Sequence, residues 1–153
     1  MSEELRARRW ATVHEHIRGE IHAADLDGAI AAFHDGDATY DVVPLAFISP
    51  PGQELTHPTA SSVREHLEML TTAFPDLELV VERVHHADDA VVVEGRTQGT
   101  HRGDMMGLPP TGRRMDVRAC VVYRFDGDRM TNETIYFDLA TQLRQLGLEK
   151  MDL

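Results

Sequence analysis

The sequence predicts a single α+β domain over residues 1–153, with helices packed on one face of a strongly curved antiparallel or mixed sheet. Two observations support this prediction. The first half of the chain has apolar residues at helical spacing, whereas the second half has long segments in which apolar and polar residues alternate. A chain of 153 residues is long enough for one domain with a proper core, and it contains no internal repeat or linker.

Three helices are expected in the first half, over residues 4–24, 25–33 and 63–73. Asp25 is the expected N-cap of the second helix, because its side chain can accept a hydrogen bond from a free backbone amide. For the third helix the expected N-cap is Ser61 or Ser62, with Glu65 placed for a capping box.

A short strand, Tyr40–Pro44, is expected between the second and third helices. Residues 46–56 are expected to form a loop or a small hairpin at the mouth of a pocket. About four long strands follow, over residues 77–86, 90–101, 115–125 and 129–137. The last two form a hairpin, because Asp126-Gly127-Asp128 can supply a tight turn. A short C-terminal helix over residues 139–146 then begins after Asp138 and ends at Gly147.

The composition argues against several classes of protein. A net charge of −11 is unsuited to binding nucleic acid, whose phosphates require a basic surface. No apolar run is long enough to span a membrane. We therefore expect neither nucleic acid nor a membrane as a partner. The single cysteine, Cys120, excludes an internal disulfide and favours a reducing, cytoplasmic location.

Five motifs follow one another in the second half of the chain. They are Phe74-Pro75-Asp76, Gly99-Thr100-His101-Arg102-Gly103, Pro109-Pro110-Thr111-Gly112-Arg113, Arg124-Phe125-Asp126-Gly127, and Asp138 followed by Gln145-Leu146-Gly147. In this order they resemble the SnoaL-like polyketide cyclase (ester cyclase) family of the NTF2-like fold. The resemblance implies a cone with an apolar interior and a cofactor-free pocket. It also implies aldol-type chemistry, in which a carboxylic acid protonates a forming alkoxide.

The chain departs from this family at positions that matter for catalysis. The resemblance places the family's catalytic Asp at Ile135 and a His of the preceding strand at Val121. Epoxide-hydrolysing relatives have a Tyr and an Asn on the first strand, where this chain has Tyr40 and Val42. Aliphatic side chains cannot exchange protons, so a catalytic protein would have to use other groups.

Glu133 is the best remaining acid or base. If Ile135 faces the pocket, strand alternation places Glu133 on the same face, where an apolar pocket would raise its pKa. The opposite register, with Glu133 in solvent and Asn132, Thr134 and Tyr136 inside, is equally compatible with the sequence. Tyr40 is expected to hydrogen-bond a substrate carbonyl or a water, and the alternative is an aromatic wall residue.

Two further residues have a structural and a functional interpretation. His101 could act as a general base or stabilise an enolate, but we favour a structural histidine that holds the loop over residues 103–112. Asp138 is better explained as a helix N-cap than as a catalytic acid.

The remaining expected pocket residues are mostly apolar and would bind substrate: Val42, His57, Ala119, Val121, Tyr123, Ile135 and Phe137. We expect no metal and no cofactor. His14, His16 and His22 lie near the apolar stripe of the first helix, but no cluster of partner ligands accompanies them, so we interpret them as surface or core histidines.

Three functions are compatible with these observations. The first is a cofactor-independent enzyme that cyclises or isomerises an apolar, polyketide-like carbonyl compound. The second is a non-catalytic binding or dimerisation module, and the third, less favoured, adds water to an epoxide. By family analogy the outer face of the sheet, with Val80, Val92 and Val122, is expected to bury against a second subunit in a homodimer or larger assembly.

Overall fold

The computed structural model describes residues 1–22, 25–33, 38–48 and 56–148 of the chain. Its centre is one curved six-stranded sheet with the strand order β2-β1-β6-β5-β4-β3. The strands are β1 (Tyr40–Val42), β2 (Thr56–His57), β3 (Glu78–His86), β4 (Ala90–Thr100), β5 (Arg114–Asp126) and β6 (Arg129–Phe137). Neighbouring strands are antiparallel except β1 and β6, which are parallel, so the sheet is mixed.

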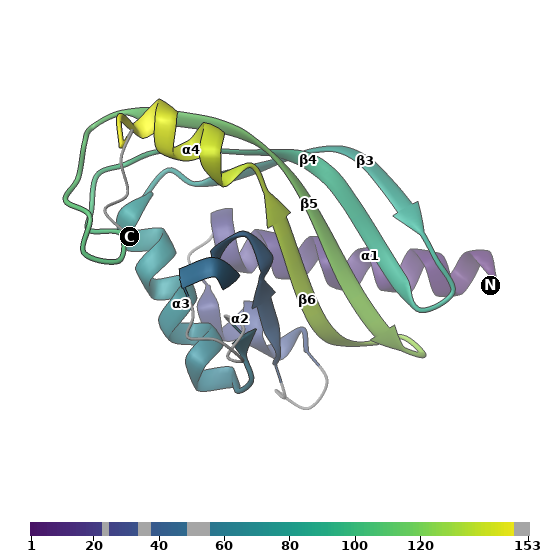
Figure 1. Cartoon of the computed structure of the whole chain (residues 1–153). Helices are drawn as coiled ribbons and strands as arrows, with labels where there is room; N and C mark the ends of the chain where they lie inside the picture. Colours follow the sequence, from purple (N-terminus) through teal and green to yellow (C-terminus); the bar gives the residue numbers. More distant parts are fainter. Residues whose placement is uncertain (23–24, 34–37, 49–55, 149–153) are drawn as a thin grey trace.

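The helices cover the concave side of this sheet (Figure 1). They are α1 (Glu3–Ile17), the π-helix η1 (Arg18–His22), α2 (Leu26–Ala31), the 3₁₀-helix η3 (Val43–Ile48), α3 (Ala60–Ala73) and α4 (Leu139–Leu146). Helix α1 crosses beneath β4 and β6, while α4 packs on β5 near the other end of the sheet (Figure 1). The predicted fold class, with four long strands, short strands, N-terminal helices and a C-terminal helix, is confirmed.

Several local predictions differ from the structure at element ends. The first helix is α-helical only to Ile17 and then continues as the π-helix η1 to His22. The third helix begins at Ala60 with Thr59 as N-cap, and Ser62 rather than Glu65 completes the capping box. Asp25 and Asp138 are N-caps as predicted.

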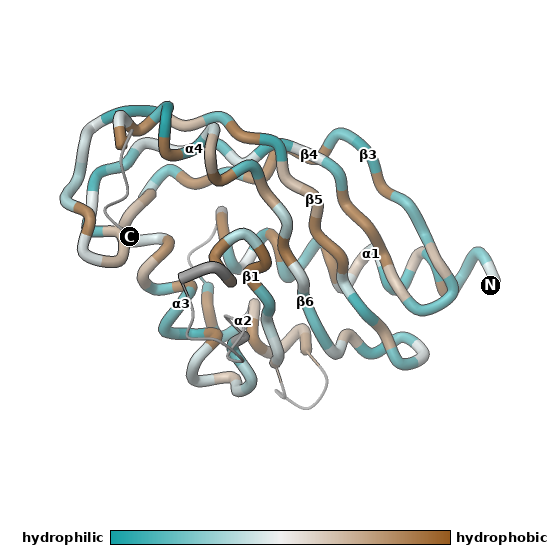
Figure 2. Tube along the Cα trace, viewed as in Figure 1, coloured by the Kyte–Doolittle hydropathy of each residue, from teal (hydrophilic) through white to brown (hydrophobic). Residues whose placement is uncertain are grey.

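The main hydrophobic core lies between the sheet and the helices. Apolar residues gather along β4 and β5 (Figure 2), and Val91, Val93 and Val121 from these strands are buried against Val13 of α1 and Leu67 of α3. A second, smaller cluster lies between α4 and the sheet, and it includes Phe74, Met115 and Leu146 of α4. None of the helices in the described part of the chain is both long and apolar enough to cross a membrane.

Candidate active site

Four polar side chains form a row across the concave face of the sheet. Tyr123 of β5 pairs with Glu133 of β6, Glu133 pairs with Tyr40 of β1, and Tyr40 pairs with His57 of β2. Directly paired residues project from the same face, so the row is continuous over four strands. Tyr40, Tyr123 and Glu133 are buried, with Glu133 only 1% exposed.

This burial decides which face of β6 lines the interior. Glu133 points inward, whereas Tyr136 is 45% exposed. Asn132 and Thr134 both hydrogen-bond Asp41 on the opposite face of the sheet. The register that places Glu133 inside is therefore the one the chain adopts.

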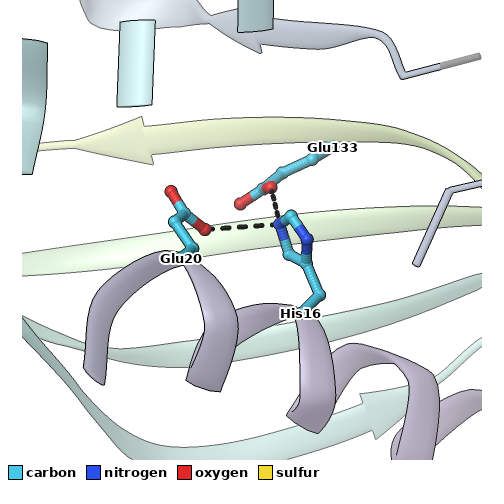
Figure 3. A group of neighbouring side chains, drawn as sticks. All are labelled: His16, Glu20 and Glu133. Carbon is cyan, nitrogen blue, oxygen red and sulfur yellow. Dashed lines mark hydrogen bonds and ion pairs between the residues drawn. The ribbon is translucent and has the colours of Figure 1, made fainter. Parts of the chain in front are cut away.

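Two side chains from the first helical segment face Glu133. His16 of α1 and Glu20 of η1 lie one helical turn apart and are 0% and 4% exposed. The Nε2 atom of His16 lies 2.7 Å from Oε2 of Glu133 and 3.3 Å from Oε2 of Glu20 (Figure 3). The packing of α1 across the sheet thus brings together two groups that are 117 residues apart in the chain.

The other nitrogen of His16 fixes how protons are placed in this cluster. Its Nδ1 lies 2.9 Å from the carbonyl oxygen of Ala29 in α2. A carbonyl can only accept, so Nδ1 carries a hydrogen and donates it. The contact between Nε2 and Glu133 then holds one further proton, which either the imidazole or the carboxyl group carries. His16 and Glu133 therefore form a proton-sharing pair.

The surroundings tune this pair toward neutral pH. Burial, and then the negative charge of Glu20, raise the pKa of Glu133 from 4.5 to about 7, although His16 and the Tyr123 hydroxyl act in the opposite direction. Burial alone would lower the pKa of His16, but the charges and hydrogen bonds of Glu133 and Glu20 outweigh it and raise that pKa well above 6.5. A carboxyl group with a pKa near 7 can both give and take a proton at neutral pH.

The same three residues are also the group in the described part of the chain that could hold a metal ion. One nitrogen of His16 and one oxygen each of Glu20 and Glu133 lie within 4.8 Å of one another. The hydrogen bond from Nδ1 to a backbone carbonyl is the support that metal-bound histidines usually have. A cation bound there would replace the shared proton.

Aliphatic side chains line the interior beside the polar row. One row further along the strands, Val121 pairs with Ile135 and Ile135 with Val42. Val121 and Val42 are buried, and Ile135 packs against the same core. One more row along, Ala119 pairs with Phe137. The expected wall residues thus share one face. The resemblance implies Asp and His at Ile135 and Val121, whereas the polar pair of this chain, Glu133 and Tyr123, lies two residues along each strand from those positions.

His57 and Tyr40 meet a histidine that the sequence analysis did not single out. His66 of α3 packs against both, with ring-centroid distances of 5.1 Å to Tyr40 and 4.7 Å to His57. The Tyr40 hydroxyl and His57 Nε2 are buried and have no hydrogen-bond partner among the described residues. Burial raises the pKa of Tyr40 well above 10, so its hydroxyl keeps its proton at neutral pH.

His101 lies in a different environment from the other expected catalytic residues. It is buried, stacks on Phe74 of the smaller hydrophobic cluster, and its Nδ1 accepts a hydrogen bond from the backbone amide of Thr111. Its own backbone bonds Gly112 and Arg113. These contacts support the structural interpretation, in which His101 holds the loop before β5.

Sequence reasoning missed His16, Glu20 and His66 as members of the site. His16 and Glu20 are spaced four residues apart, which is the signal for a pair on one helix face. Nothing local connects that pair with Glu133. His66 lies among the apolar residues of α3, and helical spacing alone does not separate a core histidine from one at a site.

The curved mixed sheet, with helices on its concave side and an acid–imidazole pair between them, defines a class of α+β cones with a buried polar centre. The profile of the SnoaL-like polyketide cyclase family matches residues 24–146. The chain therefore belongs to the SnoaL-like polyketide cyclase family. Among curated proteins, none matches its sequence.

Solved structures with the same fold are similar over most of the chain. A candidate SnoaL-like polyketide cyclase from Jannaschia sp. CCS1 has a TM-score of 0.77 and 20% identity, covering 92% of each chain. AclR from Streptomyces galilaeus, a candidate hydroxylase, has a TM-score of 0.74 and 23% identity, covering 96% of this chain and 85% of its own. An NTF2-like protein of unknown function from Burkholderia pseudomallei K96243 has a TM-score of 0.72 and 23% identity, covering 95% of this chain and 98% of its own. At these identities the likeness establishes the NTF2-like fold.

Proposed function

We propose that this protein is a cofactor-independent enzyme that moves protons on an apolar, carbonyl-bearing small molecule, polyketide-like as its family implies. The reaction is a cyclisation or an isomerisation. The observation that carries the proposal is the buried carboxyl group of Glu133, which shares a proton with His16 between the sheet and the helices. Such a carboxyl group is suited to acid–base chemistry near neutral pH.

In the proposed reaction, ionised Glu133 removes a proton from the carbon beside the substrate carbonyl. The electron pair of the broken C–H bond moves into the carbonyl group and forms an enolate, whose oxygen accepts a hydrogen bond from Tyr40. In an isomerisation, Glu133 returns the proton at another carbon. In a cyclisation, the enolate carbon attacks a second carbonyl of the same molecule and Glu133 protonates the resulting alkoxide. Val121, Ile135 and Phe137 shape the apolar wall.

The experiment follows deuterium exchange from D₂O into 2-tetralone, an apolar bicyclic ketone with acidic hydrogens beside its carbonyl. We expect the Glu133→Gln variant to lose about 10²- to 10⁴-fold of the catalysed exchange rate while it keeps its fold, because the amide cannot take up the proton. Glu78→Gln, at an exposed glutamate of β3, is the matched control and should retain the wild-type rate. Exchange that is unchanged in Glu133→Gln would contradict the assignment of the base.

A second candidate function is a non-catalytic binding module. It is favoured by the aliphatic residues Val121 and Ile135, which stand where the resemblance implies proton-handling groups. Such a module would bind 2-tetralone without raising its exchange rate above that of buffer. It would keep this affinity in Glu133→Gln and lose it in Ile135→Asp, where a charge enters the apolar wall.

We further propose that the protein works as a cytoplasmic homodimer in secondary metabolism. Support for the dimer comes from the convex face of the sheet, where Val92 and Val122 pair with each other and are only half-buried in the single chain. The free thiol of Cys120 on the same strand supports a reducing compartment.

A further inference from the structure

Next to the acid–imidazole pair, three aromatic side chains with polar atoms gather from three different elements. Tyr40 comes from β1, His57 from β2 and His66 from α3. Their ring centroids are separated by 5.1 Å between Tyr40 and His66, 4.7 Å between the two histidines, and 6.1 Å between Tyr40 and His57. The three rings therefore form one compact group at the end of the polar row.

Two polar atoms of this group are buried without a partner among the residues that the structure describes. They are the hydroxyl oxygen of Tyr40, whose side chain is 0% exposed, and Nε2 of His57. Buried polar atoms in folded proteins nearly always have a hydrogen-bond partner. Such atoms in one group therefore indicate a ligand atom that bonds to them in the working protein.

The group is uncharged but lies among carboxylates. The charges of Glu20 and Glu133 act on Tyr40, and those of Asp41 and Glu65 act on His57. Burial lowers the pKa of His57, and burial together with the charge of His57 lowers the pKa of His66 to about 4. Both imidazoles are therefore neutral at pH 7. A bound carboxylate or phosphate would meet repulsion from these carboxylates, and the three rings would offer it no positive charge.

We propose that Tyr40, His57 and His66 form a subsite that accepts an uncharged carbonyl oxygen of the substrate and rejects carboxylate and phosphate groups. This inference rests on the proposed function, because it names the part of the substrate that the same site holds. Tyr40 and Glu133 are paired on adjacent strands, which lie about 4.8 Å apart. A carbonyl oxygen held by Tyr40 thus has its neighbouring carbon beside Glu133.

The test compares two flat bicyclic probes, neutral 2-tetralone and anionic 2-naphthoate. Binding is measured by NMR titration, and the carbonyl stretching frequency of bound 2-tetralone is measured by infrared difference spectroscopy. We expect 2-tetralone to bind at least about tenfold more tightly than 2-naphthoate, with its carbonyl stretch at lower frequency than in an apolar solvent. Tyr40→Phe should weaken ketone binding about three- to tenfold and return the stretch toward the apolar-solvent value.

Two further variants make the result independent of how well Tyr40→Phe folds. His57→Ala removes the second unpartnered atom at a partly exposed position and should also reduce the frequency shift. Tyr136→Phe changes an exposed tyrosine on the outer face and should alter neither affinity nor frequency. Equal affinity for the two probes, or a stretch that Tyr40→Phe and His57→Ala leave unchanged, would overturn the subsite. So would a bound structure in which only water contacts Tyr40.

The outcomes separate this inference from the proposed enzyme activity. A wild-type protein that binds 2-tetralone with a shifted carbonyl stretch but does not speed deuterium exchange supports the subsite and contradicts the enzyme. Catalysed exchange that depends on Glu133, with no shift of the stretch, supports the enzyme and contradicts the subsite.

Discussion

At Glu133, the burial that raises the pKa of the carboxyl group also makes the stability of the protein depend on pH. The folded state holds a proton on this group up to about pH 7, whereas the unfolded chain releases it near the ordinary value of 4.5. The folded state therefore binds more protons between these values, and the contribution of Glu133 to the free energy of unfolding falls as the pH rises through this window. The raised pKa of His16 acts in the same direction, because its stabilising charge is lost as the pH rises through its folded value.

This dependence predicts how Glu133→Gln compares with the wild type. Glutamine has a similar shape but does not titrate. The unfolding free energy of the variant, measured relative to that of the wild type, should therefore rise by roughly 2–4 kcal/mol from about pH 5 to about pH 8. Urea unfolding of both proteins at the two pH values measures this change. If the difference in unfolding free energy between the two proteins is the same at both pH values, Glu133 is already ionised in the folded wild type at the lower pH, and its pKa is not raised.

At the scale of elements, the last hairpin and α4 were predictable because each depends on local chemistry. Alternating residues define β5 and β6, Gly127 supplies a positive φ in the turn, and Gly147 ends α4 in the left-handed conformation. The π-helical end of the first helix was not predictable, because it depends on packing. The parallel pairing of β1 with β6 joins segments far apart in the chain and has no local signal.

The backbones of β3 and β4 approach each other closely at Gly95 in β4. Gly95 pairs with Val81, next to a register shift in β3, and a Cβ atom there would collide with the backbone carbonyl of Val80. We expect Gly95→Ala to lower the unfolding free energy by about 2 kcal/mol or more in urea titration, because backbone must move to make room. Thr97→Ala, two residues along β4, should cost less than about 1 kcal/mol. Similar losses for the two variants would contradict this explanation.

At the scale of the whole molecule, the arrangement of the candidate site was predictable only in part. Glu133 and Tyr40 could be found because strand alternation and the family motif both concern residues near one another in the sequence. The register of β6 could not be decided, since its two faces carry similar numbers of polar residues. His16 could not be identified as the partner of Glu133, because only the crossing of α1 beneath the sheet brings them together.

The proposed dimer is a property of the convex face of the sheet. We expect sedimentation velocity to give the mass of two chains at micromolar concentration, and Val122→Lys to shift the protein toward single chains, because a charge would enter the buried interface. Glu68→Gln, at an exposed glutamate of α3 on the other side of the sheet, should leave the mass unchanged. A wild-type protein that sediments as one chain at high concentration would contradict the dimer.

The pairing of β5, β6 and β1 into successive rows has a consequence for where this fold can place an acidic side chain. Residues 133 and 135 of β6 both face the interior, and each is paired with β5 on one side and with β1 on the other. An acidic group can thus be relocated by one step of two residues, as from 135 to 133, while the backbone stays as it is. The distance from acid to substrate then changes by about 7 Å along the strand, so one scaffold can serve molecules whose reactive carbons lie at different depths.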